Sequence, residues 1–318
     1  MTDADAIVAV VVTYNRCALL AETLRAIEAQ GRRPACIVIV DNHSTDGTAD
    51  MLATLELEVP FEHLRLDRNT GGAGGFKAGM QRAYALGADW LWVMDDDCIA
   101  APDALGRLLD ARSAAGTERP GFLASRVLWQ DGTPCLMNLP VAHRLWIAPH
   151  ATAANVTRVL SSSFVSMLVA REAVEAVGYP VAEFFIWFDD VEYSRRISAV
   201  MPAYLVTDSV VVHKTPTNLA PLDFTQLDEA SLWKFRYGVR NECSFQLRAN
   251  GIADALLFVA RTIARMRRAR VPARHLRPLL GACVEGLRFD YTRHVSYPDG
   301  RADRPYAARR AHASRWVE

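Results

Sequence analysis

Two strand–turn–helix units follow each other at the start of the chain, and this pattern constrains the fold more than any other feature. Residues 7–12 form an unbroken apolar, mostly β-branched run, followed by a polar turn and by apolar residues at helical spacing up to Ile27. The pattern repeats from residues 37–40 through a polar turn at 41–47 to a helix at 51–55. Such alternation predicts parallel strands joined by helices, as in a doubly wound α/β sheet.

Ligands of doubly wound sheets bind at the carboxyl ends of the strands. The turns that follow residues 12, 40 and 94 are therefore expected to converge on one crevice. Their sequences are Thr13-Tyr14-Asn15-Arg16, Asp41-Asn42-His43-Ser44-Thr45-Asp46-Gly47 and Asp95-Asp96-Asp97. Folding alone does not require so many polar groups in three unrelated loops, so we interpret them as a binding site.

The third turn follows an apolar strand at residues 90–94. Because side chains alternate across a strand, Asp95 and Asp97 are expected on one side and Asp96 on the other. Two converging carboxylates repel each other unless a cation lies between them, and Mg²⁺ is typically held by one or two carboxylates plus substrate phosphates. The alternative is a solvated acidic turn before a helix capped near Asp103.

A glycine-rich stretch at residues 69–76 precedes a predicted helix through Met80 and Tyr84. Glycines permit positive φ and let a ligand approach backbone amides at a helix start, where anions are favoured. The stretch does not have the Walker pattern, and a flexible surface loop is the alternative interpretation. The candidate residues here are Asn69, Gly71, Gly72, Gly74 and Gly75.

The second half contains two further predicted strands, at residues 160–170 and 203–212, and the latter is followed directly by His213. A short helix is predicted at residues 172–177. An aromatic cluster then leads into a second acidic group, in the sequence Phe184-Phe185-Ile186-Trp187-Phe188-Asp189-Asp190-Val191-Glu192-Tyr193. Aromatic faces beside carboxylates suit stacking on a sugar with a base at hand. Alternatively the aromatic residues are core and the acids cap a helix.

Beyond Asp223 the chain is predicted to be helical, which divides it into residues 1–222 and a helical region at 223–318. Apolar residues at 252, 256, 259, 263 and 266 recur at helical spacing, with arginines on another face. Seven arginines and no acid lie between Arg261 and Arg277. Basic amphipathic helices of this kind bind anionic membrane surfaces, although a helical layer with a solvated basic face has the same pattern.

The composition limits the kinds of binding partner and cellular location that we expect. The 36 basic and 36 acidic side chains balance, which gives no electrostatic reason to expect nucleic acid as a partner. The six cysteines are scattered without metal-finger spacing, and the acidic N-terminus lacks the features of a secretory signal. No apolar run approaches the roughly 20 residues needed to span a bilayer. We therefore expect a cytoplasmic protein at the inner face of the membrane, as a monomer or an oligomer.

Taken together, these motifs resemble the inverting family 2 glycosyltransferases, which have the GT-A fold. The resemblance covers residues 7–214 and rests on the ordered set Thr13-Tyr14-Asn15-Arg16, Asp41-Asn42, Asp95-Asp96-Asp97, Asp189-Asp190-x-Glu192 and His213. Within that family, the glycine-rich stretch and the segment from Trp187 to Tyr193 are most similar to bacterial galactofuranosyltransferases. The short length is similar to the type that initiates cell-wall galactan. In the polymerising type Trp directly precedes the Asp pair, whereas Phe188 intervenes here.

The resemblance implies a donor site for UDP-galactofuranose. The residues that would contact the donor are Thr13, Asn15, Arg16, Asp41, Asn69, Gly71, Gly72, Gly74, Gly75, Asp95 and Asp96. Among them, Asp41 would accept a hydrogen bond from uracil N3. Mn²⁺ or Mg²⁺ would be held against the diphosphate by Asp95, Asp97 and His213.

The implied acceptor is a polyprenyl-diphosphate-linked rhamnosyl-N-acetylglucosamine. The residues on its side would be Asp189, Asp190, Glu192, Trp187 and Phe188. Asp190 would take the proton from the acceptor hydroxyl, and Asp189 or Glu192 would orient the acceptor.

Three other functions fit parts of the sequence. A dTDP-rhamnose-dependent rhamnosyltransferase of the same fold is the nearest, because thymine and uracil share the edge that Asp41 would read. A sugar-nucleotide nucleotidyltransferase would need a basic glycine-rich loop near the N-terminus, which residues 13–18 do not provide. A non-catalytic scaffold at the membrane surface would have no need for the acidic candidates together with His213.

Overall fold

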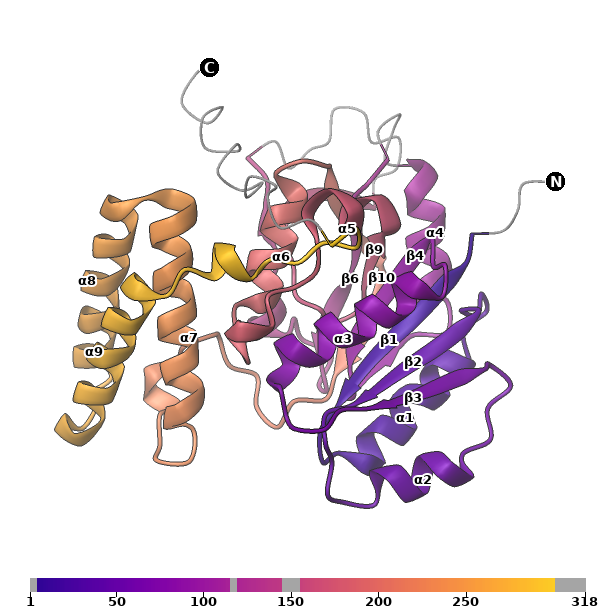
Figure 1. Ribbon diagram of the computed structural model, residues 1–318, viewed down its shortest axis with the longest axis horizontal. Helices are drawn as coiled ribbons and strands as arrows, with labels where there is room; N and C mark the ends of the chain where they lie inside the picture. Colours follow the sequence, from indigo (N-terminus) through magenta and orange to yellow (C-terminus); the bar gives the residue numbers. More distant parts are fainter. Residues whose placement is uncertain (1–4, 115–118, 145–154, 301–318) are drawn as a thin grey trace.

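The structure is a computed structural model that describes residues 5–114, 119–144 and 155–300. The end of the predicted helical region, residues 301–318, lies outside the described residues. A mixed sheet forms the centre, with helices on its faces and a group of long helices at one side (Figure 1). The strand order is β3-β2-β1-β4-β9-β6-β10-β8-β7, and β5 pairs with β10.

The first half of the sheet is parallel, as the strand–turn–helix pattern predicts. Strand β1 lies between β2 and β4, and β3 extends the sheet beyond β2. The strands are β1 (Ile7–Thr13), β2 (Cys36–Asp41), β3 (Phe61–Arg65) and β4 (Trp90–Asp95). The connecting helices are α1 (Cys17–Glu28), α2 (Thr48–Thr54) and α3 (Gly71–Ala85). Strands β1 and β4 are buried almost throughout, because helices cover both faces of the sheet, and this explains their unbroken apolar sequence.

The second half mixes strand directions. Strand β9 runs antiparallel to β4 and β6, whereas β10 runs parallel to β6 and antiparallel to β5 and β8. The strands are β5 (Cys98–Ala100), β6 (Phe122–Trp129), β7 (Val141–Ala142), β8 (Val156–Ser161), β9 (Met167–Ala170) and β10 (Ala203–His213). The helices are α4 (Ala104–Ala114), α5 (Arg171–Val177) and α6 (Asp189–Ser198).

The prediction of a single strand at residues 160–170 is wrong, because the structure divides this segment into β8 and β9. Ser166, at the break, has a positive φ of 56°. Its buried hydroxyl accepts a hydrogen bond from Trp92 Nε1 at 3.0 Å and lies 2.7 Å from Ser125 Oγ. These contacts hold a turn inside an apolar run that periodicity alone cannot divide.

The long helices α7, α8 and α9 lie side by side, in orange to yellow in Figure 1. They are α7 (Leu232–Phe245), which continues into a π-helical turn (Gln246–Asn250), α8 (Ile252–Arg268) and α9 (Ala273–Arg288). They enclose a hydrophobic cluster of their own, which includes Leu222, Phe235 and Met266. Leu256, predicted in the apolar stripe, is exposed, and Phe258 takes the buried position instead.

The segment after α9 returns from the helical group toward α5 (Figure 1). Tyr179 N–H donates to the Ser296 carbonyl at 2.9 Å, and the buried ring of Tyr291 packs against Phe184 and Phe245. The helical group is therefore attached to the rest of the molecule along both the segment that enters it and the segment that leaves it. None of the helices in the described ranges is both long and apolar enough to cross a membrane.

Candidate active site

The turns after β1 and β2 are joined by hydrogen bonds. Asn15, with a φ of 54°, accepts from Thr45 N–H at 2.7 Å through its side-chain oxygen, and its own N–H donates to Ser44 Oγ at 3.0 Å. Asparagine tolerates this left-handed conformation better than most residues. Asn15 therefore holds the two turns together at the carboxyl edge of the sheet.

The turn after β4 joins the same group. Thr13 Oγ1 donates to Asp96 Oδ2 at 2.7 Å, and Arg16 Nη1 donates to Asp97 Oδ2 at 2.5 Å and to Asp96 Oδ1 at 3.3 Å. The expected convergence of the three turns is thus present. Asp96 points toward the β1 turn, which leaves Asp95 and Asp97 to form a separate group.

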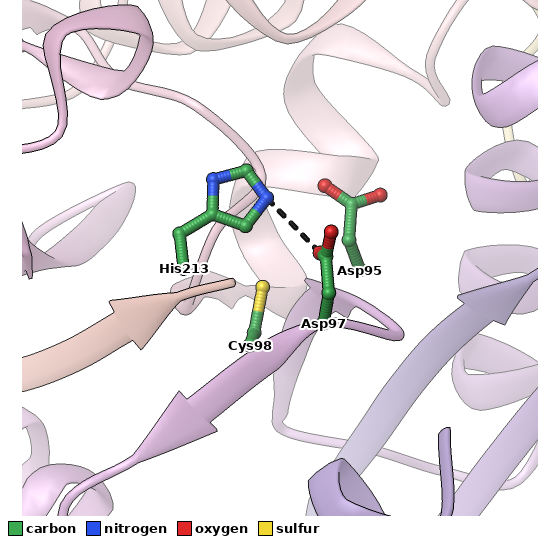
Figure 2. Close-up of side chains that lie close together, drawn as sticks. All are labelled: Asp95, Asp97, Cys98 and His213. Atoms are coloured by element: carbon green, nitrogen blue, oxygen red, sulfur yellow. Dashed lines mark ion pairs between the residues drawn. The ribbon is translucent and has the colours of Figure 1, made fainter. Parts of the chain in front are cut away.

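A group of potential metal ligands lies at the end of β4. Ligand atoms of Asp95, Asp97, Cys98 and His213 lie within 4.8 Å of one another. Figure 2 shows the ring of His213 facing the two carboxylates, with its Nε2 3.0 Å from Asp97 Oδ1. The strand pairing of β5 with β10 places His213 directly opposite Cys98, and so brings β10 to the triple aspartate.

A second contact fixes the orientation of His213. Its Nδ1 lies 2.8 Å from Asn138 Oδ1, and Asn138 donates in turn to Ser163 Oγ at 2.9 Å. An imidazole whose Nδ1–H donates to an oxygen presents Nε2 toward a metal, as in most protein metal sites. Asn138 was not predicted, because it lies in a short turn, η1 (Leu136–Asn138), with no sequence pattern that points to the site.

The charges in this group depend on burial. Burial raises the pKa of Asp95 to about 7, and the charge of Asp97 adds to the rise. Burial also tends to raise the pKa of Asp97, but contacts with His213 and Arg16 outweigh it and lower that pKa. Burial alone would lower the pKa of His213, whereas its contacts with Asp97 and Cys135 and the nearby carboxylates raise it to about 10. Positive charge from Arg16 and His213 therefore keeps Asp97 ionised.

The donor set fits a hard divalent cation. Burial and the surrounding carboxylates raise the pKa of the Cys98 thiol well above its usual value, and hard divalent cations prefer oxygen ligands to sulfur. Two carboxylates and one imidazole remain, which suit Mn²⁺ or Mg²⁺ when substrate oxygens complete the coordination. His213 must lose its proton to bind such an ion.

Asp41 is completely buried at the end of β2. Its Oδ1 accepts from Ser44 N–H at 2.7 Å, whereas its Oδ2 has no hydrogen-bond partner among the described residues. Arg65 and His63 approach Oδ2 only to 3.6 and 3.5 Å. A buried carboxylate oxygen without a donor is costly, and a ligand N–H would satisfy it.

The glycine-rich stretch lies inside α3 rather than before it, which corrects the predicted helix start. A Cβ at Gly71, where φ is +72°, would lie 2.0 Å from the Phe185 carbonyl oxygen; at Gly74 it would meet Thr70, and at Gly75 Val12. These glycines therefore allow close packing, and their surroundings do not support the predicted contact with a donor. Of the four, only Gly72 has open space where a side chain would lie.

Asparagines fix the start of α3. Asn69 Oδ1 accepts from Gly71 N–H at 2.8 Å. Asn42 Nδ2 donates to the Gly71 carbonyl at 2.7 Å, and its Oδ1 accepts from Thr70 N–H at 2.8 Å. Asn69, predicted to approach a donor, therefore serves as a local cap here.

Asp189 and Asp190 begin α6. Burial raises the pKa of Asp189 well above its usual range, and the neighbouring Asp190 and Asp95 contribute. The first turn of α6 and the metal-ligand group therefore share one electrostatic environment. Burial also raises the pKa of Asp190, to about 6, although its Oδ1 accepts from Val191 N–H at 2.7 Å. Asp190 is partly exposed and Asp189 is buried, so a substrate has better access to Asp190.

The loop before α6 is strained. Phe185, Trp187 and Phe188 all have positive φ values, between 63° and 74°, which cost energy for non-glycine residues. The buried side chain of Asn241 in α7 holds this loop, because its Nδ2 lies 2.9, 3.1 and 2.8 Å from the carbonyl oxygens of Phe184, Ile186 and Trp187. Asn241 was missed in the sequence, where it is one polar residue on a helix.

Glu192, the third acidic residue in the first turn of α6, has different surroundings from Asp189 and Asp190. It is fully buried, and both of its carboxylate oxygens accept hydrogen bonds from Arg196, at 2.9 and 3.1 Å. Arg196 also donates to the carbonyls of Val177 and Tyr179. The ion pair ties α6 to the segment after α5, so the surroundings of Glu192 do not support its predicted contact with an acceptor.

The two aromatic residues predicted on the acceptor side pack into the protein. Trp187 lies edge-on to Phe235, with ring centroids 5.2 Å apart, and belongs to the hydrophobic cluster of the helical group. Phe188 packs at 5.2 Å against Phe245. Their surroundings favour the alternative that these aromatic residues are core.

Comparisons with known proteins agree with this architecture. The model of the family described as Glycosyl transferase family 2 matches residues 8–118. Galactofuranosyltransferase GlfT1 of Mycolicibacterium smegmatis is 33% identical over 206 residues, which cover 62% of this chain and 67% of the relative. An N-acetylglucosaminyl-diphospho-decaprenol L-rhamnosyltransferase of Mycobacterium tuberculosis is 27% identical over 67% of this chain and 77% of its own length.

A solved structure, the mannosyltransferase PcManGT from Pyrobaculum calidifontis in complex with GDP-Man and Mn²⁺, superimposes with a TM-score of 0.53. The match covers 90% of this chain and 88% of that one at 16% identity. At this identity the likeness shows the fold alone, and the predicted GT-A fold is confirmed.

Proposed function

Because the chain belongs to glycosyl transferase family 2 and is a glycosyltransferase, we propose that it transfers galactofuranose from UDP-galactofuranose with inversion. The proposed acceptor is a polyprenyl-diphosphate-linked rhamnosyl-N-acetylglucosamine, and the reaction would initiate cell-wall galactan. The observation that carries this proposal is the group of Asp95, Asp97 and His213 at the carboxyl edge of the sheet, in a relative of GlfT1. We assign the chemistry to residues 1–222, and positioning and membrane contact to the helical region from 223 on.

The donor would lie across the three converging turns. The Oδ2 of Asp41, which accepts no hydrogen bond from the described residues, suits the N3–H of uracil. Thr13, Asn15 and Arg16 lie along the sheet edge between β2 and β4. Asp95, Asp97 and His213 would hold Mn²⁺ or Mg²⁺. When bound, such an ion neutralises the charge that develops on the diphosphate as UDP leaves. Arg16 would move from Asp97 to the donor phosphates. Arginine forms strong charge-assisted hydrogen bonds with phosphate oxygens, and Asp97 would then be paired with the metal ion.

Asp190 would act on the acceptor. Its carboxylate takes the proton from the acceptor hydroxyl as that oxygen bonds to the anomeric carbon, opposite the breaking bond to UDP. A base with a pKa of about 6 is ionised at neutral pH and still accepts a proton readily. Burial and the neighbouring carboxylates raise the pKa of Asp189 well above its usual range, which favours its protonated form, so we assign Asp189 to orienting the acceptor by donating a hydrogen bond. Acceptor contacts by Trp187, Phe188 and Glu192 stay sequence-based predictions, which the observed packing does not favour.

A transfer assay with Mn²⁺ tests the proposal. Purified protein is offered UDP-galactofuranose, UDP-galactopyranose or dTDP-rhamnose together with a short-chain prenyl-diphosphate rhamnosyl-N-acetylglucosamine. Transfer from UDP-galactofuranose alone is the expected result.

The second candidate is a dTDP-rhamnose-dependent rhamnosyltransferase, which the rhamnosyltransferase relative favours. For this candidate, the assay adds an acceptor that ends in N-acetylglucosamine. Transfer from dTDP-rhamnose to that acceptor would replace the first proposal with the second.

We also propose that α8 and α9 contact an anionic membrane surface, because apolar and basic side chains are exposed on both. The exposed apolar residues are Ile252, Leu256, Leu257, Leu280 and Val284. The exposed arginines nearby are Arg261, Arg265, Arg267, Arg268, Arg270, Arg274 and Arg277. Apolar insertion and attraction to anionic lipid together bind such helices at a bilayer surface. This arrangement would place a cytoplasmic enzyme at the inner face of the membrane, near its lipid-linked acceptor.

Liposome flotation checks the membrane proposal. The protein should float with vesicles that contain anionic lipid at low salt, and less so at high salt, because salt screens the arginines. Leu256→Asp should reduce flotation severalfold, because it places a charge in the apolar part of the contact. Val200→Asp changes another exposed apolar residue, away from α8 and α9, and serves as the control. Equal flotation of the two variants, or none by the unmodified protein, would contradict the proposal.

Asn241 should position the base. Asn241→Ala removes the donor shared by three loop carbonyls, so kcat should fall on the order of 10- to 100-fold, as for other supporting residues of active sites. The Kd for UDP with Mn²⁺ should stay within about twofold, because Asn241 does not touch the donor turns. Gln226→Ala, which truncates an exposed amide, is the control. A loss of UDP binding that parallels the fall in kcat would instead indicate general unfolding.

A further inference from the structure

A small cavity on the helical group has no role in the function proposed so far. It has a volume of about 160 Å³ and is lined by Trp233, Arg236, Tyr237, Arg240 and Glu285. Residues three and four apart share one face of a helix, so the four residues from α7 form a single surface that Glu285 of α9 completes. We call it the α7–α9 pocket. It is small beside the roughly 300–1,000 Å³ of typical ligand sites, which limits it to one ring of a larger ligand.

Aromatic rings form one wall of the pocket. Trp233 is 43% exposed, which is unusual for so large an apolar side chain. Its orientation is fixed by edge-on contacts with Phe185 and Tyr237, at 6.1 and 6.3 Å between ring centroids. Phe185 stacks on Tyr237 at 5.0 Å. An exposed ring that is already held in place loses little entropy when a ligand covers it.

The polar groups of the pocket are of both signs. Arg236 and Glu285 form an ion pair of 3.3 Å at its mouth, and each is about half exposed. Arg240 lies 4.7 Å from the ring centroid of Tyr237 and donates to the Glu183 carbonyl at 2.6 Å, so it is fixed in position. Paired donors and acceptors suit the hydroxyl groups of a sugar, because each hydroxyl both donates and accepts. A diphosphate would be repelled by Glu285 and would compete with it for Arg236.

Phe185 connects the wall of the pocket to the proposed active site. Phe185, which packs against Trp233 and Tyr237, begins the strained loop that leads to Asp189 and Asp190. The Phe185 carbonyl accepts from Ala73 N–H at 3.1 Å, in the first turn of α3. The aromatic wall of the pocket therefore packs against the first residue of the loop that positions the proposed base.

We propose that the α7–α9 pocket is a carbohydrate subsite that binds a sugar ring of the acceptor other than the ring whose hydroxyl reacts. Trp233 stacks on the C–H face of that ring, and Arg236 and Glu285 hydrogen-bond to its hydroxyls. This inference rests on the proposed function for the identity of the acceptor, and on the pocket alone for the class of ligand.

Trp233→Ala tests the subsite. We expect the KM for the prenyl-diphosphate disaccharide acceptor to rise on the order of 10-fold, with kcat and the Kd for UDP changed less than about threefold. Glu285→Gln, a milder change at an exposed position, should raise the same KM about two- to threefold. Leu86→Ala, at an exposed position after α3 and outside the helical group, is the control and should leave the KM unchanged. An unchanged acceptor KM in both pocket variants would overturn the subsite.

A binding measurement separates failure of the subsite from failure of the proposed function. In saturation-transfer difference NMR with free rhamnosyl-N-acetylglucosamine, the unmodified protein should saturate ring protons of the disaccharide, and Trp233→Ala should lose most of that signal. If the unmodified protein transfers no galactofuranose, the proposed function fails, and this signal still tests the pocket. Equal signals from the two proteins, or displacement of the sugar by inorganic diphosphate, would overturn the subsite.

Discussion

Asp97→Asn should lower kcat/KM for Mn²⁺-dependent transfer by at least about 10³-fold, the largest effect that we expect. Metal ions stabilise developing charge by several kcal/mol, and each 1.36 kcal/mol is a factor of ten in rate. Asp97 is buried between His213 and Arg16 and forms an ion pair with each of them. An amide at this position keeps the size of the side chain but removes the charge that attracts the ion.

Isothermal titration calorimetry with UDP, in Mn²⁺ and in chelator, measures this effect directly. The unmodified protein should bind UDP more tightly with Mn²⁺, and the variant should show no difference between the two conditions. Asp208→Asn removes a carboxylate from an exposed position on β10 and should behave as the unmodified protein. Metal-dependent binding that survives in Asp97→Asn would exclude Asp97 as a ligand.

Asp190→Asn should lower kcat by about 10²- to 10⁴-fold, the range typical of a lost general base. UDP binding should be retained, because Asp190 does not contact the donor turns in this structure. Asp189→Asn should have a smaller effect, because burial raises the pKa of Asp189 and so favours its neutral form, and an amide donates a hydrogen bond in its place. Near-normal turnover of Asp190→Asn, or a larger loss in Asp189→Asn, would transfer the role of base away from Asp190.

The pH dependence provides a second readout for Asp190. A general base works in its ionised form, and the pKa of Asp190 is raised to about 6. The kcat of the unmodified enzyme should therefore fall as pH drops through about 6, approaching a tenfold loss per pH unit. The residual kcat of Asp190→Asn should not show this fall at acidic pH. If Asp190 had a purely structural role, the pH profile of the variant would have the same shape as that of the unmodified enzyme.

Local sequence patterns specify the parallel half of the sheet and the edge at which the site forms. The apolar runs of β1, β2 and β4 are local signals, and each is followed at once by its polar turn. Strand ends and turn composition are encoded within a few residues, so periodicity locates them without tertiary information. The same local alternation separated Asp96 from Asp95 and Asp97.

How side chains distant in sequence meet depends on tertiary packing. The contact between Asn138 and His213 joins residues 75 positions apart, and that of Asn241 with Trp187 spans 54. Neither has a repeating signal, because such contacts depend on how whole strands and helices pack. The same reason explains why Glu192 belongs to an ion pair with Arg196 and why three glycines of α3 serve packing. Residue type and order indicated the chemistry, whereas packing decided which groups are buried, charged and close enough to perform it.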